Sequence, residues 1–524
     1  MKTRALPDGF AVYVWATSSA EVAERHGLRP EQVLRFDQNV PPVPGVPQVP
    51  LAESFARLNE YPEGTYRELR EAAAAYSGVE PEQVVVGAGA DDLIGTCART
   101  FLGPGRRAAW SPPTYALYRI ATHLEGAQLV VERDGADLIW VCNPNNPTGE
   151  LVAPEEVAAL ARAYPQAAVV VDEAYFEYAG GATCAPLLAG APNIVVLRTL
   201  SKAFGFASLR VGYALASPEA AAQLELRRAP APVAGPAARI AAAALRDPRF
   251  DVTGDVAERE RVRAALLAAG YDCPPTFANF VWLRSGEPLG ERLEEQGIVV
   301  RRFAEGIRIT LRRPLENDVV LRALGAEPGP PPGRGAYVAR TTTETALRLA
   351  LDLDGSGRVR VATGIGFLDH LLTLLAFHAG FDLELVAGGD LEVDEHHTVE
   401  DVLAALGDGL AQALGTREGV TRYGSATVPM DEARATAAVD LVRRSHAEIA
   451  LAFGSDRVGG LALTLLPHAL ERFAMQAGCT VHVDSAGLDD HHVAEAAFKA
   501  LGQALRQAVA PGGGAGIRST KGAA

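Results

Sequence analysis

Hydrophobic and polar positions follow one pattern before residue 327 and another after it. In the first part, short apolar runs alternate with alanine-rich stretches of helical character. Four runs lack polar alternation, as strands buried on both faces do, at residues 83–86, 139–142, 168–172 and 194–197. Two stretches between runs predict helices, at residues 152–164 and 219–228. The pattern predicts an α/β domain with a mainly parallel sheet flanked by helices.

A stretch rich in proline and glycine, at residues 327–336, separates this domain from the rest of the chain. Such a stretch continues neither a helix nor a strand, so we interpret it as a linker. It leaves residues 1–326 as the first domain and residues 337–524 as the second. In the second domain strands are followed by helices, and this order occurs twice. We expect an α+β domain with two similar halves, at about residues 337–430 and 431–524.

The second half of this domain repeats a histidine motif of the first half. His396-His397 is followed by Glu400, and His491-His492 is followed by Glu495. Each motif opens an alanine-rich helix, which places its first histidine and its glutamate one turn apart on one face. Other positions match as well, among them His370/His468, Ala376/Ala474, Ala405/Ala500 and Gly407/Gly502. We interpret the domain as an internal duplication.

The repeated motifs predict metal binding, although a single HHxxE motif can also be an ordinary solvated helix start. They divide evenly into two sites of three imidazoles and one carboxylate, a set that manganese, iron, cobalt or zinc accepts. Adjacent histidines on a helix point about 100° apart, so each pair should bridge two separate sites rather than chelate one ion. The candidate ligands are His370, His396, His397, Glu400, His468, His491, His492 and Glu495.

In the first domain, polar motifs follow the predicted strands. Lys202 lies among hydroxyl groups and near an arginine, which suits an aldehyde cofactor that carries a phosphate. Asp172 ends a strand and can pair with a protonated ring nitrogen, while Tyr175 and Asn146 can reach a ring hydroxyl. Each motif alone is typical of ordinary turns, but their order along the chain favours a cofactor site. The candidate phosphate ligands are Ala90, Asp91, Thr199, Ser201 and Arg210.

Composition and charge narrow the class of protein. The net charge of −15 argues against nucleic acid and anionic membranes as partners. No apolar run approaches the ~20 residues of a membrane span, and the run at residues 10–16 is too short for a secretory signal. The five cysteines are scattered and form no CxxC pair, which excludes a cysteine zinc site and suits a reducing compartment. We expect a cytoplasmic enzyme that acts on small molecules.

The first domain resembles the fold-type I pyridoxal-phosphate aminotransferases, and above all the histidinol-phosphate aminotransferases. The shared strings lie at residues 143–149, 172–175, 201–205, 209–213 and 278–280. The resemblance implies that Lys202 holds pyridoxal 5′-phosphate and acts as a general base, and that Tyr115 stacks on the cofactor ring. It implies a dimer in which Tyr61 reaches the partner's cofactor phosphate. It further implies that Arg308 binds a substrate carboxylate and Arg301 a substrate phosphate.

The second domain is similar to the imidazoleglycerol-phosphate dehydratases over almost its whole length. The shared strings lie at residues 363–370, 394–401, 422–424, 429–432, 491–500 and 519–522. The resemblance implies two Mn²⁺ ions per domain on the eight candidate ligands, and a closed shell of roughly 24 subunits. It implies Glu344 as an acid–base group in contact with substrate, and His370 and His378 as further substrate contacts. The residues implied for the substrate phosphate are Arg422, Arg444, Lys499, Ser519 and Lys521.

The two resemblances imply consecutive steps of histidine biosynthesis. The second domain would dehydrate imidazoleglycerol phosphate to imidazole-acetol phosphate, and the first would transaminate this ketone with glutamate to give histidinol phosphate. Two alternatives stay open. The first domain could be a different pyridoxal-phosphate enzyme, such as a decarboxylase of an amino-acid phosphate. Alternatively, one domain could be retained only as an assembly scaffold.

Overall fold

The computed structural model describes residues 10, 12–13, 16–30, 33–42, 45, 49, 55, 58–250, 252–329 and 334–512. The chain divides into two compact units. Residues 35–313 and 321–327 belong to the first unit, together with residues up to 18. Residues 19–34 and 314–320 belong to the second unit, together with the chain from residue 328 onward. Each unit has its own sheets and its own hydrophobic core.

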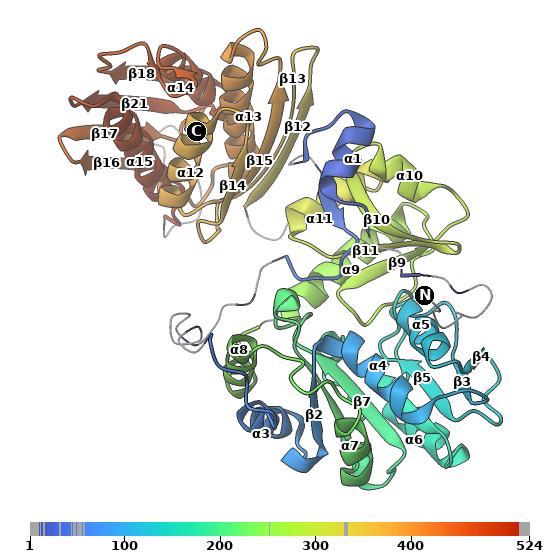
Figure 1. Ribbon diagram of the computed structural model, residues 1–524. Helices are drawn as coiled ribbons and strands as arrows, with labels where there is room; N and C mark the ends of the chain where they lie inside the picture. Colours follow the sequence, from blue (N-terminus) through green and yellow to red (C-terminus); the bar gives the residue numbers. More distant parts are fainter. Residues whose placement is uncertain are drawn as a thin grey trace, which may run out of the picture. The chain divides into compact units, whose positions relative to one another are not determined.

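A seven-stranded sheet forms the centre of the first unit, in the order β2-β8-β7-β6-β5-β3-β4 (Figure 1). All neighbouring pairs from β7 to β4 are parallel, and β8 alone runs against both of its neighbours. Successive side chains of a strand enter opposite cores: Val169 and Val171 join one cluster, and Val170 joins the other. The strands therefore read as unbroken apolar runs, because helices cover both faces.

The predicted strands and helices of this unit are present, with their ends shifted by a few residues. The strands of the large sheet are β2 (Val84–Gly87), β3 (Arg107–Ala109), β4 (Gln128–Val130), β5 (Leu138–Cys142), β6 (Ala168–Asp172), β7 (Ile194–Thr199) and β8 (Gly212–Ala216). The helices that belong wholly to this unit are α3 (Arg67–Ser77), α4 (Gly89–Phe101), α5 (Ala116–Leu124), α6 (Pro154–Ala163), α7 (Pro218–Glu225), α8 (Gly235–Arg246), α9 (Val252–Ala268) and α10 (Leu289–Glu294). Helix α1 (Ser19–His26) and most of α11 (Pro314–Ala323) belong to the second unit.

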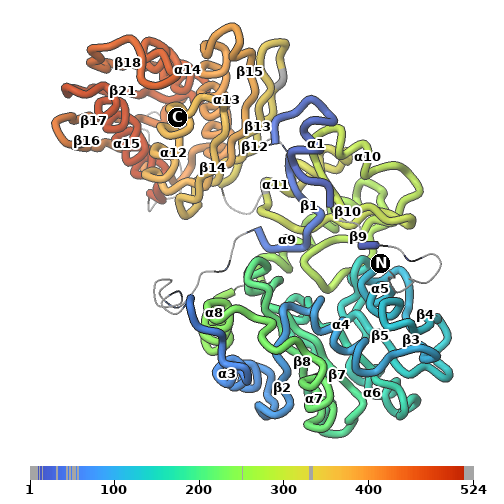
Figure 2. The backbone as a smooth tube through the Cα atoms, viewed as in Figure 1, coloured from blue at the N-terminus to red at the C-terminus, as the bar shows by residue number. Residues whose placement is uncertain are grey.

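A smaller sheet has the order β1-β10-β11-β9. Its strands are β1 (Leu34–Phe36), β9 (Phe280–Arg284), β10 (Ile298–Phe303) and β11 (Gly306–Thr310). Figure 2 shows β1, in blue, beside β10, in yellow-green, although they are far apart in sequence. The antiparallel register places Arg301 opposite Arg308 on neighbouring strands. Two of the predicted substrate-binding residues are thereby brought together.

The second unit contains two four-stranded sheets with the same strand order and the same directions. In each sheet two antiparallel pairings are followed by one parallel pairing, giving β12-β13-β15-β14 and β16-β17-β21-β18. The first comprises β12 (Gly335–Thr341), β13 (Thr345–Asp352), β14 (Val359–Ala362) and β15 (Asp382–Gly389). The second comprises β16 (Tyr423–Met430), β17 (Ala433–Asp440), β18 (His446–Leu451) and β21 (Thr480–Ala486), and a small hairpin is formed by β19 (Arg457–Val458) and β20 (Leu461–Ala462).

Four helices lie between these two sheets (Figure 1). They are α12 (Gly366–Ala379), α13 (His396–Leu414), α14 (Leu465–Ala477) and α15 (Asp490–Val509). They pack crosswise, α12 against α15 and α13 against α14. A Cβ on Gly407 would lie 2.5 Å from the Phe473 carbonyl oxygen, and one on Gly502 would lie 2.5 Å from that of Leu375. Glycine therefore permits the close approach in both helix pairs.

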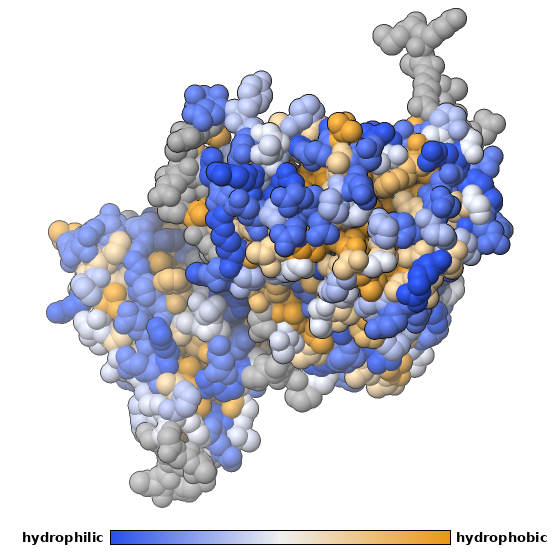
Figure 3. Space-filling model, turned by 90° about the horizontal axis from the view of Figure 1, so that it is seen from below, coloured by the Kyte–Doolittle hydropathy of each residue, from blue (hydrophilic) through white to orange (hydrophobic). Residues whose placement is uncertain are grey.

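The surface gives no sign of a membrane-spanning element in the described part of the chain. No helix among the described residues is both long enough and apolar enough to cross a bilayer. Figure 3 shows hydrophilic side chains over much of the face in view, with hydrophobic positions in small groups among them.

Candidate active sites

A cavity of about 510 Å³ opens in the first unit, where parallel strands of the large sheet end. Cys142, Asp172 and Thr199 are the last residues of β5, β6 and β7, and all three line it. Ligands bind at this edge of open parallel sheets, because the loops there converge. The cavity collects every aminotransferase residue predicted from the sequence except Tyr61, namely Ala90, Asp91, Tyr115, Asn146, Asp172, Tyr175, Thr199, Ser201, Lys202, Arg210, Arg301 and Arg308.

Lys202 projects its amine into this cavity. Its Nζ donates a hydrogen bond to the backbone oxygen of Asn39 at 3.0 Å and lies 5.4 Å from the centre of the Tyr175 ring. Burial, reinforced by the nearby Arg308 guanidinium, lowers the pKa of Lys202 to about 8. A lysine tuned in this way has a substantial neutral fraction near neutral pH, as a nucleophile and a general base require.

Asp172 is a buried carboxylate that faces the same cavity. It is 5% exposed and accepts hydrogen bonds from the Tyr118 hydroxyl at 2.8 Å and from the Ala174 N–H at 3.2 Å. Burial raises its pKa to about 6. Within the described chain no cationic side chain forms an ion pair with it. The site is therefore suited to a ligand that brings a positive charge to this carboxylate.

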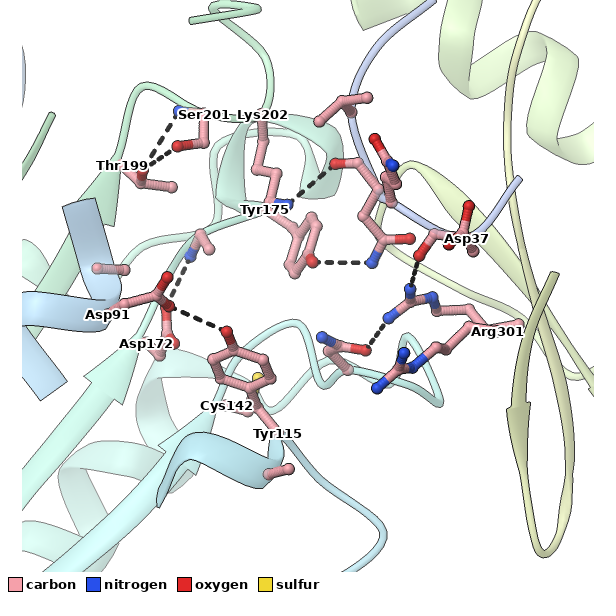
Figure 4. Close-up of a pocket in the computed structure, with 18 of the residues that line it drawn as sticks. Asp37, Asp91, Tyr115, Cys142, Asp172, Tyr175, Thr199, Ser201, Lys202 and Arg301 are labelled. Atoms are coloured by element: carbon pink, nitrogen blue, oxygen red, sulfur yellow. Dashed lines mark hydrogen bonds between the residues drawn. The ribbon is translucent and has the colours of Figure 1, made fainter. Parts of the chain in front are cut away.

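One side of the cavity carries the groups predicted to hold a phosphate. Arg210 donates to Asp91 at 3.0 Å, and Asp91 also accepts from the Tyr115 hydroxyl at 2.9 Å. The Thr199 and Ser201 hydroxyl groups lie 2.9 Å apart. Figure 4 shows Thr199, Ser201 and Asp91 on one side of the cavity and Arg301 on the opposite side. The two anion-binding regions are thus well separated across the site.

Arg308 is held rigidly at the side of the cavity where Arg301 lies. It is 6% exposed and donates to the Asn146 side-chain oxygen at 2.5 Å and to the Asp37 backbone oxygen at 2.6 Å. Burial, with a further contribution from Arg301, lowers the pKa of Arg308 to about 10. Even so, it stays a cation at neutral pH, so two positive charges face a substrate here.

Asn39 is a cavity residue to which the sequence assigned no role. Its side chain donates to the Tyr175 hydroxyl at 2.9 Å, and its backbone oxygen accepts from Lys202. It has a left-handed backbone, with φ of 51°. An asparagine tolerates this conformation better than most residues, which is a local signal in the sequence. Tyr13 also lines the cavity and was not anticipated.

Tyr61 lies away from the cavity. Its side chain is 94% exposed and lines a separate hollow of about 330 Å³ with Tyr66 and Arg239. The structure of one chain therefore leaves this tyrosine available to another molecule.

The second unit brings six of the eight predicted metal ligands into two clusters. Cluster A consists of His370 from α12 and of His491 and Glu495 from α15. One oxygen of Glu495 lies 2.6 Å from Nε2 of His370 and 3.0 Å from Nε2 of His491. These contacts, together with Lys499, outweigh partial burial and lower the pKa of Glu495 to about 2. The carboxylate is thus ionised and ready to bind a cation.

Cluster B has the same composition and comes from the other helix pair. It consists of His396 and Glu400 from α13 and of His468 from α14. One oxygen of Glu400 lies 3.4 Å from Nε2 of His396 and 3.3 Å from Nε2 of His468. In both clusters the ligand atoms lie within 4.8 Å of one another, which is a distance that one metal ion can bridge.

The remaining two histidines, His397 and His492, belong to neither cluster and have other partners. Nδ1 of His397 lies 3.1 Å from an Asp390 oxygen, and Nδ1 of His492 lies 3.0 Å from a Glu432 oxygen. These carboxylates raise the pKa of both imidazoles. A carboxylate on Nδ1 fixes the ring and leaves Nε2 for a ligand, as is usual at metal sites. Within one chain each cluster therefore has two imidazoles, and the third of each predicted set is not part of it.

The residues predicted to contact the substrate of the second unit are only partly placed near the clusters. Nε2 of His397 lies 3.9 Å from an exposed Glu344 oxygen. Lys499 donates to the second oxygen of Glu495 at 2.5 Å. Arg422 is held by Asp440 at 2.7 Å, and Arg444 lies between β17 and β18. His378 lies near Lys499, and burial and the charge of that amine lower the pKa of its imidazole. Ser519 and Lys521 fall outside the described residues.

Comparison with known proteins matches the two parts of the chain to different families. The family model of aminotransferases of class I and II matches residues 31–324, and that of imidazoleglycerol-phosphate dehydratase matches residues 363–505. An imidazoleglycerol-phosphate dehydratase from Granulibacter bethesdensis is 51% identical over 193 residues, which is 36% of this chain and 98% of that protein. One from Phytophthora nicotianae is 42% identical over 262 residues, but the chain spans only 57% of its length and half of this chain is matched.

Solved structures resemble the first unit. A crystal structure of histidinol-phosphate aminotransferase from Sinorhizobium meliloti in complex with pyridoxal-5′-phosphate has a TM-score of 0.54 and 26% identity. The match covers 60% of this chain and 94% of the Sinorhizobium meliloti chain. N-succinyldiaminopimelate aminotransferase from Mycobacterium tuberculosis shares the fold, with a TM-score of 0.53 and 22% identity over 62% of this chain and 99% of that one. The chain therefore belongs to the class I and II aminotransferases through its first unit and to the imidazoleglycerol-phosphate dehydratases through its second.

Proposed function

We propose that the chain catalyses two consecutive reactions of histidine biosynthesis, one in each unit. The second unit removes water from imidazoleglycerol phosphate to give imidazole-acetol phosphate, and the first transfers the amino group of glutamate to this ketone to give histidinol phosphate. The observation that carries the assignment is the pairing of Arg301 and Arg308 in the cavity that contains Lys202. An arginine pair can hold the carboxylate of glutamate in one half-reaction and the phosphate of the ketone in the other.

The cavity residues fit pyridoxal 5′-phosphate. Asp172 lacks a cation partner in the described chain and suits a protonated ring nitrogen, whereas Thr199, Ser201 and Arg210 suit a phosphate. When bound, the cofactor supplies an electron-withdrawing ring that stabilises negative charge on the substrate carbon.

The protein's own contribution to transamination is to hold the substrate and to move a proton. Lys202 has the lowered pKa that a general base needs, and its Nζ is positioned by the Asn39 carbonyl. Arg308, fixed by Asn146 and Asp37, orients a substrate carboxylate by charge-assisted hydrogen bonds. Tyr61 is exposed and would reach the cofactor phosphate in a second copy, so the aminotransferase is proposed to be a dimer.

In the second unit, clusters A and B fit one divalent cation each, and we assign these to Mn²⁺ on the basis of the family. Such ions lower the pKa of a bound imidazole and of a hydroxyl group. Each cluster lacks a third imidazole within one chain, whereas the imidazoles of His397 and His492 belong to neither cluster. These two histidines are therefore proposed to complete the clusters of neighbouring copies, which would make assembly into a closed shell of roughly 24 subunits a requirement for activity.

Other groups of this unit would handle protons and the phosphate. Glu344 lies beside His397 and is exposed, so it can exchange protons with substrate as a general acid and base. His378 is assigned as a further substrate contact. The substrate phosphate is assigned to five cationic or hydroxyl side chains, namely Arg422, Arg444, Lys499, Ser519 and Lys521. The functional domains are proposed as residues 1–326 and 337–524, joined by the linker at 327–336, with the second domain derived from a duplication.

A one-pot assay tests both halves of the proposal. The purified chain, pyridoxal phosphate, Mn²⁺, glutamate and imidazoleglycerol phosphate should yield 2-oxoglutarate and histidinol phosphate. The Lys202→Ala variant should accumulate imidazole-acetol phosphate and form no histidinol phosphate. The Glu495→Gln variant should form neither 2-oxoglutarate nor histidinol phosphate unless imidazole-acetol phosphate is supplied. Carbon dioxide release from an amino-acid phosphate, without 2-oxoglutarate, would instead identify the first unit as a decarboxylase. If the wild-type protein binds no metal after purification without chelators, the second unit is an assembly scaffold rather than an enzyme.

A further inference from the structure

In both clusters the glutamate uses its two oxygens for different partners. Oε1 of Glu495 faces the two imidazoles of cluster A, and its Oε2 accepts a hydrogen bond from Lys499 at 2.5 Å. In cluster B the two imidazoles face Oε2 of Glu400, and Nε of Arg472 lies 2.8 Å from Oε1. Arg472 Nε meets no acceptor at hydrogen-bond geometry, so this contact is an ion pair. Each glutamate thus keeps one oxygen for its histidines and gives the other to a cation.

The two cations come from positions that do not correspond in the repeat. Lys499 lies on α15, one turn after Glu495, and the matching position in the first half is Ala404, which is fully buried. Arg472 lies on α14, one turn after His468, and the matching position there is Leu374. The same contact has therefore been built twice from different helices. A chance surface ion pair would not be expected to recur on the equivalent oxygen.

Electrostatics decides what such a cation does for a metal site. A carboxylate can bind a divalent ion through one oxygen or through both. A cationic side chain on one carboxylate oxygen leaves only the other oxygen, the one that faces the histidines, available to a metal ion. The same charge repels a divalent ion a few ångströms away, so it does not act by strengthening metal affinity. Its effect is to restrict how the carboxylate binds.

We propose that Arg472 is a positioning residue that holds Glu400 to single-oxygen metal binding in cluster B, as Lys499 holds Glu495 in cluster A. The restriction leaves room on the ion for substrate or water that a second carboxylate oxygen would otherwise fill. This inference rests on the proposed metal sites of the second unit.

The test measures metal binding and metal-bound water in the full-length chain. Mn²⁺ titration followed by electron paramagnetic resonance gives the number and affinity of bound ions, and water-proton relaxation gives the exchangeable water on them. The variants are Arg472→Leu, Arg472→Lys, and Arg358→Leu as a matched control. Arg358 forms a 2.7 Å ion pair with Asp382 in the same unit and touches neither cluster.

Arg472→Leu should bind as many ions as the wild type with equal or tighter affinity, while the exchangeable water falls by about one molecule per chain. Arg472→Lys, which keeps the charge, and Arg358→Leu should both match the wild type. A tenfold loss of Mn²⁺ affinity in Arg472→Leu, or unchanged relaxation at full occupancy, overturns the inference. A wild-type chain that binds no Mn²⁺ overturns instead the proposed function on which it rests.

Discussion

Asp172 gives an unusual prediction, because removing its charge should stabilise the protein without cofactor. The carboxylate is buried beneath the cavity and accepts hydrogen bonds from Tyr118 and Ala174 without a cationic partner in the described chain. In Asp172→Asn an isosteric neutral group replaces it. The substitution changes the free energy of the unfolded chain little, because the carboxylate is solvated there. The folded chain is stabilised, because it no longer buries a charge.

The magnitude follows from the pKa. Raising the pKa of Asp172 from 3.8 to about 6 destabilises the ionised folded state by about 3 kcal/mol. An asparagine has one acceptor oxygen and so gives up one of the two hydrogen bonds, which costs about 1 to 2 kcal/mol. The free energy of unfolding of the apoprotein should therefore rise by about 1 to 2 kcal/mol at pH 7.5.

The pH dependence distinguishes this effect from ordinary packing. Well below pH 3.8 the carboxyl is protonated in both states and contributes no penalty. The penalty develops as the pH rises from the unfolded pKa of 3.8 to the folded pKa of about 6, and it is complete above that value. The advantage of Asp172→Asn should accordingly be present at pH 7.5 and disappear toward pH 4.

Urea unfolding of apoprotein, followed by tryptophan fluorescence, is the assay. All four tryptophans precede the linker, so the signal reports on the first unit alone. The same variant should bind pyridoxal phosphate less tightly, because the charge that pairs with the ring nitrogen is gone. An apoprotein destabilised by more than about 1 kcal/mol at pH 7.5, with the same loss near pH 4, would refute the reasoning.

Four further predictions concern both units. Lys202→Ala should abolish transamination and leave dehydration intact, measured as separate product yields; loss of both reactions would contradict independent sites. Apoprotein should take up pyridoxal phosphate faster as the pH rises to about 8, where the Lys202 amine becomes neutral, and stopped-flow absorbance that is flat with pH would argue against this. Chelation should stop dehydration but not transamination, with metal content followed by elemental analysis. Gly407→Ala should destabilise the second unit by about 1–3 kcal/mol in circular-dichroism unfolding, because its Cβ would meet the backbone of α14, whereas Gly460→Ala, which meets nothing within 4 Å, should have little effect.

The sequence predicted those features whose cause is local. Apolar runs without alternation identified the central strands, since burial on both faces allows no polar position. Lys202 and Asp172 were placed correctly in one cavity, because parallel strands end at a common edge. The divergence of His396 and His397 was expected from the helical period, and the two imidazoles have different partners, Glu400 and Asp390 respectively.

Features that depend on packing between distant elements could not be predicted in the same way. The contact between Arg472 and Glu400 joins α14 to α13, and no spacing in the sequence signals it. Asn39 approaches Lys202 only because residues 37–40, which are remote from Lys202 in sequence, line the same cavity. The helical period predicted that adjacent histidines serve separate sites, but no spacing in the sequence signals that each cluster contains only two imidazoles within one chain.

The crosswise pairing of the four central helices has a mechanical consequence. Cluster A ties α12 to α15, and cluster B ties α13 to α14, so each spans the seam between residues 337–430 and residues 431–524. An ion bound in either cluster would link the two halves. It would raise the free energy of unfolding by about 2.7 kcal/mol when the free ion is present at a hundred times its dissociation constant. In a cell short of metal the seam would be closed by side-chain packing alone. The lifetime of the protein against proteolysis, and not only its catalytic rate, would then follow the supply of metal.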